Sequence, residues 1–146
     1  MKGNISKLVF LLIVLYLLLL SYWMMFGFGR AQQAEYMYNL KPFSTISHFL
    51  QFDNFNTKTS IINLFGNIGV FIPFGILMPV ILKLSLHKLF VVYLCGLFVL
   101  ELIQLISRRG SLDIDDFILN SIGFFIGYGI NRIIALRVNS NRGGIA

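Results

Sequence analysis

Long runs of apolar residues, separated by short polar segments, dominate this chain. Four of the runs are long enough to cross a membrane, because about 20 helical residues span a hydrocarbon core of about 30 Å. They lie at about residues 8–28, 61–82, 89–107 and 117–136. The pattern therefore predicts an all-α membrane protein with four transmembrane helices, forming one domain over residues 1–146.

Composition supports this prediction and narrows the classes of function. The chain is 57% hydrophobic and 12% charged, whereas soluble domains carry about 25% charged residues. The net charge of +6 does not indicate a nucleic-acid partner, because the Lys and Arg residues are spread around helix ends, as membrane insertion requires. The one cysteine, Cys95, and the two isolated histidines, His48 and His87, give no metal-binding pattern. We expect no cofactor, and membrane lipids as the surroundings.

The distribution of basic residues predicts the orientation. Four spans place both termini on one side, and seven of the 12 Lys and Arg residues would share that side, mostly in short connections. The positive-inside rule then favours cytoplasmic termini, an N-in/C-in arrangement. The first span has no small-residue cleavage site after it, so we interpret it as a retained helix. The long segment 29–60 and the loop 108–116 would lie outside.

The long first outside segment has a helical pattern of its own. Apolar residues recur at near-helical spacing within residues 44–56, and Ser44 is a candidate N-cap. Such a helix could lie on the membrane surface with its apolar face down, or act as a lid over the bundle. The pattern does not separate these alternatives.

Glu101 is the most unusual residue in the predicted spans. A carboxylate at mid-bilayer costs roughly 2.5–3.5 kcal/mol on insertion scales. Depth along the helices, at about 1.5 Å per residue, places Asn67 and Glu101 about 9 Å below the outer boundary and Asn120 about 5 Å below it. These polar residues thus share the outer end of the bundle.

The spacing of the polar residues predicts that they face one another. Asn63 and Asn67 are four residues apart, as are Asp116 and Asn120, so each pair shares one helix face. Polar stripes in lipid should turn inward, because hydrocarbon leaves them unsatisfied. We therefore predict a polar cup at the outer end of the bundle. Its candidate ligand-binding residues are Asn63, Asn67, Glu101, Gln104, Arg108, Arg109, Asp113, Asp116 and Asn120.

Structural roles are the alternative for each feature. The two asparagines could join helices by hydrogen bonds, and Arg108 and Arg109 could be flanking charges that reach lipid head groups. The aspartates near residue 115 could be a solvated loop or favour a helix N-terminus. Gly123 and Gly127 are four residues apart and predict close helix packing.

These motifs resemble the VanZ-like family of small bacterial membrane proteins over about residues 36–130. The stretches that carry the resemblance are Asn39-Leu-Lys-Pro-Phe-Ser-Thr-Ile46, Asn63-Leu-Phe-Gly-Asn-Ile-Gly-Val-Phe-Ile-Pro-Phe-Gly75, Glu101-Leu-Ile-Gln104, Arg108-Arg-Gly110 and Asp113-Ile-Asp-Asp-Phe-Ile-Leu-Asn-Ser-Ile-Gly123. The family takes its name from a member associated with teicoplanin resistance. The resemblance implies a multi-pass protein of the bacterial cell membrane, with a role in the response to glycopeptides.

Three functions are compatible with the predicted cup. The first is binding of a lipid head group, a lipid-linked cell-wall precursor or the glycopeptide itself. The second is a membrane-embedded enzyme in which Glu101, Asp115 and Asp116 are the catalytic candidates, with Mg²⁺ held against a phosphate by Asp115 and Asp116. The third is a transporter, which the clustering of polar residues at one end disfavours. The oligomeric state is open.

Overall fold

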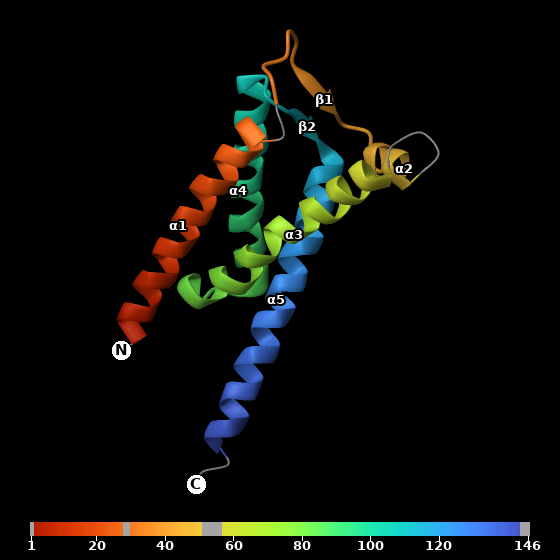
Figure 1. Cartoon of the computed structure of the whole chain (residues 1–146). Helices are drawn as coiled ribbons and strands as arrows, with labels where there is room; N and C mark the ends of the chain where they lie inside the picture. The colour runs from red at the N-terminus through yellow and green to blue at the C-terminus, as the bar shows by residue number, and fades with distance from the viewer. Residues whose placement is uncertain (1, 28–29, 51–56, 144–146) are drawn as a thin grey trace.

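Five helices and two short strands make up the part of the chain described by the computed structural model, residues 2–27, 30–50 and 57–143. In chain order the elements are α1 (Lys2–Phe26), β1 (Met37–Asn39), α2 (Ser44–Leu50), α3 (Thr57–Leu82), α4 (Leu86–Ser107), β2 (Ser111–Asp113) and α5 (Ile114–Gly143). The start of α1 and the end of α5 lie at one end of the molecule, and both strands and α2 lie at the other (Figure 1).

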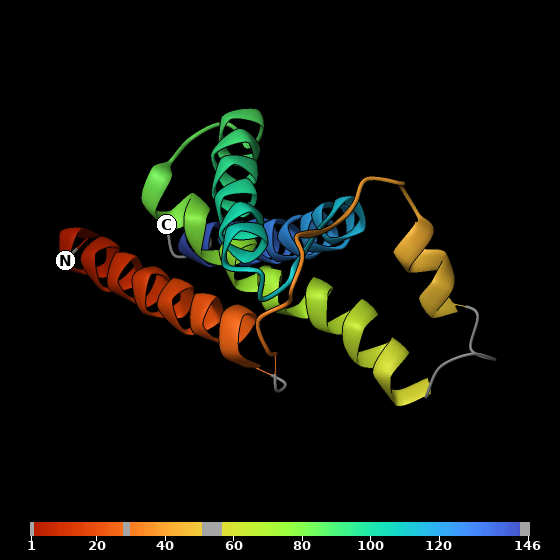
Figure 2. The ribbon, with the colours of Figure 1, turned by 90° about the horizontal axis from the view of Figure 1, so that it is seen from above.

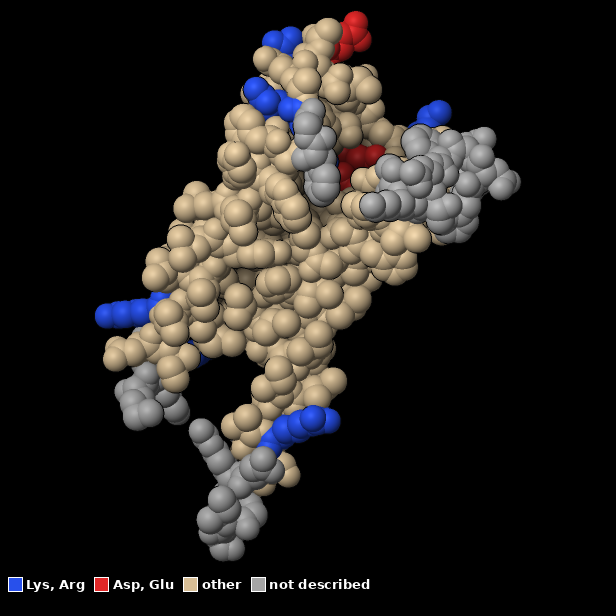
Figure 3. Space-filling model, in the orientation of Figure 1, with Lys and Arg blue, Asp and Glu red and all other residues tan. Residues whose placement is uncertain are grey.

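The four long helices are apolar enough to cross a membrane. Within the described residues the candidate spans are Asn4–Phe26, Ile61–Leu82, Leu86–Ser107 and Ile114–Val138. The prediction of four spanning helices is confirmed, and the second span has the predicted limits. Charged side chains gather toward the two ends of the molecule and leave an uncharged belt between them (Figure 3). The N-in/C-in orientation stays a prediction.

Helices α3 and α5 pack backbone against backbone. A Cβ atom on Gly123 would overlap the carbonyl oxygen of Ile68, and one on Gly127 would overlap that of Ile72. The same hypothetical atom on Gly127 would lie 3.0 Å from the Cα of Gly75. Because only glycine leaves room for this approach, the packing role predicted for Gly123 and Gly127 is confirmed.

An aromatic core lies between α3, α4 and α5. Phe124 is fully buried, and its ring stacks on that of Tyr93 with 4.4 Å between the centroids. Phe71 meets Tyr93 edge-on, and Leu89 and Leu97 complete the same cluster. This packing fixes the three helices on the side of the bundle away from the strands.

A parallel pair of strands joins the first outside segment to the α4–α5 connection. Met37 pairs with Ser111, Tyr38 with Leu112 and Asn39 with Asp113. The all-α prediction is confirmed by the helices, and this short pair is a feature that the prediction lacked. Strands of three residues give too short an alternation to stand out in a sequence, and parallel pairing depends on segments far apart in the chain.

Helix α2 begins at Ser44, as its sequence predicts, and is described as far as Leu50. The rest of the predicted 44–56 helix lies outside the described residues. The first half of α3 lies between α1 and α2 (Figure 2), and α2 contacts both α3 and α5. The choice between an interfacial helix and a lid stays open.

Candidate functional site

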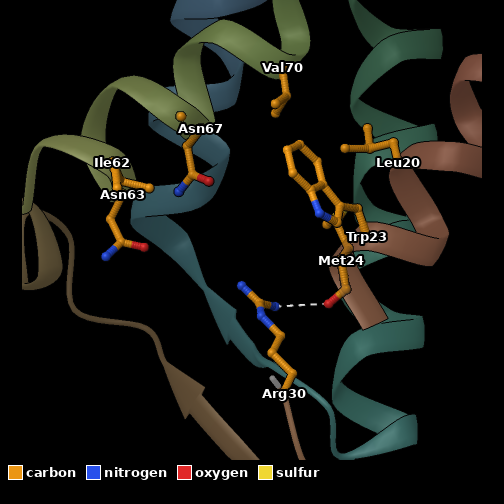
Figure 4. A pocket seen from close by; sticks show the side chains of 9 residues that line it. Leu20, Trp23, Met24, Arg30, Ile62, Asn63, Asn67 and Val70 are labelled. Carbon is orange, nitrogen blue, oxygen red and sulfur yellow. Dashed lines mark hydrogen bonds between the residues drawn. The ribbon is translucent and has the colours of Figure 1, made fainter. Parts of the chain in front are cut away.

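A cavity of about 540 Å³ lies between α1 and α3. We call it the apolar cavity, since most of its lining side chains are apolar. Its wall consists of Leu20, Trp23 and Met24 from α1, Arg30 from the following segment, and Ile62, Asn63, Gly66, Asn67 and Val70 from α3. Figure 4 shows the Arg30 guanidinium extending into the space between the two helices.

A second cavity, of about 260 Å³, lies at the strand end of the bundle. We call it the polar cavity. Its lining residues are Arg30, Ala31, Gln33, Met37, Gln104, Arg109, Gly110, Ser111 and Asp116. Arg30 lines both cavities, so they adjoin at this side chain. Acidic side chains are visible at the bottom of a hollow near this end of the molecule (Figure 3).

Asn67 and Asp116 form the hydrogen-bonded link between the two cavities. The Asn67 side-chain amide donates to Asp116 Oδ1 over 2.6 Å. Asn67 lines the apolar cavity and Asp116 lines the polar cavity. The pair therefore forms part of the boundary between them, with the carboxylate presented to the polar side.

Arg30 is a basic residue whose positive charge acts on two carboxyl groups, those of Glu101 and Asp116. Its Nη1 donates a hydrogen bond to the Met24 carbonyl oxygen over 3.0 Å. The sequence-based list of site residues does not include Arg30. It follows the end of the first span, where a basic residue is usually an ordinary flanking charge, and only its position against α3 and α5 sets it apart.

Glu101 is buried beside this boundary without a hydrogen bond. It is 1% exposed, and neither carboxylate oxygen accepts a hydrogen bond from the described residues. The Asp113 backbone lies near this carboxyl group and acts on it. Asn120 is 2% exposed, and its side-chain oxygen also lacks a described donor. Buried polar atoms without partners are costly and rare, so this pair indicates a role beyond packing.

Gln104 and Arg109 contribute from the end of α4. The Gln104 amide donates to the Met24 carbonyl oxygen over 3.2 Å, which ties α4 to the end of α1. The Arg109 guanidinium lies 4.6 Å from the Phe26 ring centroid, and its Nη1 donates to the Arg30 carbonyl oxygen over 3.4 Å. Contacts with α1 and with the segment after it thus hold Arg109, like Arg30, beside the polar cavity.

Asp115 and Asp113 hold α2 instead of facing the cavities. The Asp115 carboxylate accepts hydrogen bonds from the backbone N–H groups of Phe43, Thr45 and Ile46 at 2.6, 2.8 and 3.0 Å. Asp113 accepts one from the Thr45 hydroxyl at 2.5 Å. Asp115 is fully buried, and this anion at the start of α2 compensates the unpaired N–H groups there.

Arg108 points toward the first outside segment. It ends α4 in the left-handed conformation, with φ of 54°. Its Nη1 donates to the Ala34 carbonyl oxygen over 3.0 Å, and its guanidinium lies 5.8 Å from the Tyr36 ring centroid. Arg108 lines neither of the two cavities.

The structure therefore divides the predicted site residues into three groups. The first group lines one of the two cavities and consists of Asn63, Asn67, Gln104, Arg109 and Asp116. The second group is buried beside the cavities and consists of Glu101 and Asn120. The third group contacts the outside segment and consists of Arg108, Asp113 and the catalytic candidate Asp115. The described residues contain no group of three or more His, Cys, Asp and Glu side chains placed to hold a metal ion.

Comparison with known proteins supports the family resemblance that the sequence motifs indicate. A family model described as VanZ/LLP1 matches residues 8–135. No curated protein and no solved structure matches the chain. The family match covers α3 and α4 in full, most of α1 and α5, and the residues that line both cavities. It confirms the resemblance inferred from residues 36–130. This membrane-spanning chain belongs to the VanZ/LLP1 family.

Proposed function

We propose that this protein binds the phosphate-bearing head group of a membrane lipid, with lipid-linked cell-wall precursors included in that class. The observation that carries the proposal is the position of Arg30, which lines both the apolar and the polar cavity. Arg109 lines the polar cavity with it. Two guanidinium groups at one cavity favour a phosphate, whose oxygens match their planar donor geometry.

Asp116, the acidic residue of the polar cavity, supports a head group that carries hydrogen-bond donors as well as a phosphate. Asp116 is an acceptor beside the two arginines, while Gln104 offers an amide. A bare phosphate would meet the Asp116 charge, whereas a phosphate that carries hydroxyl or amine donors would satisfy the arginines and the carboxylate together. The arrangement therefore favours glycerol- or sugar-substituted phosphates over inorganic phosphate.

The location of the cavities supports a ligand taken from the membrane. Both lie at the strand end of the four apolar helices, and the predicted orientation makes this the outer leaflet. A lipid-linked precursor or a phospholipid is present at this depth, whereas a soluble phosphate is not. The family resemblance adds a cellular expectation: through this binding, the protein contributes to tolerance of teicoplanin-type glycopeptides in bacteria.

Binding is tested by native mass spectrometry of the purified full chain with phosphatidylglycerol, a polyprenyl phosphate and phosphatidylcholine. Arg30→Gln and Arg109→Gln should each weaken retention of the first two lipids by about ten-fold or more, because each removes a charge-assisted contact. The control is Arg137→Gln, an exposed position at the opposite end. Equal retention by wild type and both cavity variants would contradict the proposal.

The cellular expectation has its own test. Wild-type protein expressed in a susceptible bacterium should raise tolerance to teicoplanin, and Arg30→Gln should abolish the increase at equal membrane abundance. Tolerance that is independent of Arg30 would separate resistance from head-group binding.

A second candidate function is catalysis on the same lipid. The observation that favours it is Glu101, a buried carboxyl group without a described hydrogen-bond partner, on which the Asp116 charge acts directly. A carboxyl pair beside an arginine suits acid–base chemistry at a phosphate or glycosidic oxygen. Product formation from a lipid-linked sugar phosphate by wild type, absent in Glu101→Gln, would support it. Retention of intact lipid with no product would favour binding.

A further inference from the structure

The apolar cavity has the size and shape of a ligand site in its own right. Its volume of about 540 Å³ falls within the range of about 300–1,000 Å³ typical of small-molecule sites. Trp23 and Ile62 line it yet remain 50% and 45% exposed, so they form a rim at the surface between α1 and α3. Both rim residues lie within candidate membrane spans, near the ends of those spans. The cavity would therefore open sideways between α1 and α3, close to the membrane surface.

The order of groups along the cavity matches an amphiphile. Leu20 and Val70 give it apolar walls, and Asn63 and Asn67 lie on the α3 side (Figure 4). Arg30 stands where the apolar cavity meets the polar one. A ligand would therefore meet hydrocarbon first, amides next and guanidinium groups last. This sequence mirrors the chain, linkage and phosphate of a membrane lipid.

We infer that the apolar cavity holds one hydrocarbon chain of the ligand, whose phosphate-bearing head group lies in the polar cavity. The inference rests on the proposed function and adds the substrate class: an intact chain-bearing lipid phosphate that enters sideways between α1 and α3. A detached sugar phosphate would leave the apolar cavity unfilled. The phosphate is common to this ligand and to the intact lipid, and the hydrocarbon chain distinguishes them.

Gly66 and Gly69 provide a matched pair of test positions. A Cβ atom added at either glycine meets nothing within 4 Å, so neither position is closed to a substitution by close packing at the backbone. Gly66 lines the apolar cavity, whereas Gly69, on the same helix, does not. Gly66→Leu therefore fills the cavity, and Gly69→Leu adds the same side chain outside it. Ile62→Trp, which closes the rim, is a second blocking variant should Gly66→Leu fail to fold.

The experiment uses phosphatidic acid with a diazirine in one acyl chain, placed in phosphatidylcholine nanodiscs with the full-length protein. After illumination, mass spectrometry locates the adducts. Wild type should be labelled at Leu20, Trp23 and Val70 in excess of exposed apolar positions of the spans such as Val99. Gly66→Leu should lower the cavity adducts by about ten-fold, and Gly69→Leu should leave them unchanged. Unlabelled phosphatidic acid should suppress them more than glycerol 3-phosphate at equal concentration.

The outcomes separate the inference from the proposed function. Cavity adducts that do not exceed those at Val99, or that survive both blocking variants, overturn the chain site even if retention still depends on Arg30. Equal suppression by glycerol 3-phosphate would also overturn it, because the chain would then add nothing. Cavity adducts that depend on Gly66, with lipid retention independent of Arg30 and Arg109, would support the chain site and refute the head-group site.

Discussion

The amide of Asn67 in α3 and the carboxylate of Asp116 in α5 lie 2.6 Å apart and form a hydrogen bond across the two most closely packed helices. Hydrogen bonds between membrane helices contribute on average about 0.6 kcal/mol and at most about 1.7 kcal/mol. The first prediction is that a double-mutant cycle of Asn67→Ala and Asp116→Ala gives a coupling energy in this range, measured by unfolding in detergent. Additive effects of the two substitutions would contradict the direct contact.

The close approach of α3 and α5 predicts a steric penalty at Gly127. Gly127→Ala places a methyl group against the Ile72 carbonyl oxygen and should lower the free energy of unfolding by about 1–3 kcal/mol. Gly129→Ala is the matched control on the same helix, because its added Cβ meets nothing within 4 Å. The control should be neutral or stabilising by up to about 1 kcal/mol. Equal effects at the two glycines would refute the backbone contact.

The three backbone hydrogen bonds to Asp115 predict a local opening of α2. A helix of seven residues is not stable alone, so its order depends on this carboxylate. Asp115→Asn should speed hydrogen exchange at Phe43, Thr45 and Ile46 by about ten-fold or more, since contacts to a charged group contribute about 1.5–3 kcal/mol. Glu35→Gln, an exposed acidic position, should leave exchange unchanged. Unaltered exchange in Asp115→Asn would mean that other contacts hold α2.

Glu101 predicts opposite effects on stability and binding. Glu101→Met keeps a similar shape and removes two buried acceptors that have no described partner, so the free energy of unfolding should rise by about 1–3 kcal/mol. Lipid retention should fall in the same variant. Leu97→Met, one turn earlier on the buried face of α4, is the control for side-chain repacking. A Glu101→Met protein that is less stable than wild type would show that Glu101 joins helices.

The sequence was sufficient for the helices because their signal is local. Each apolar run contains enough residues to predict a span, and the limits of α3 and α4 follow from polar residues at their ends. Most of the family motifs likewise reside in α3, α4 and α5. Depth along the helices also predicted that Asn67, Glu101 and Asn120 lie at one end of the bundle.

The partners of those residues depend on tertiary structure and were not predictable in the same way. Asp115 and Asp116 are adjacent in sequence, yet one faces the start of α2 and the other faces Asn67. Adjacent residues of a helix point about 100° apart, and the packing of α2 and α3 against α5 decides which carboxylate meets which partner. Arg30 was missed for a related reason, since a single arginine after a span has no periodic pattern that reveals its role.

The strand pair has a consequence for biogenesis. Met37 and Ser111, which pair in register, both line the polar cavity, and Phe43 lies 72 residues before its partner Asp115. The ribosome therefore releases β1 and α2 long before the residues that anchor them exist. The polar cavity is complete only once α5 has supplied Asp116, so a nascent chain with three helices in the membrane still lacks part of the lining of this cavity.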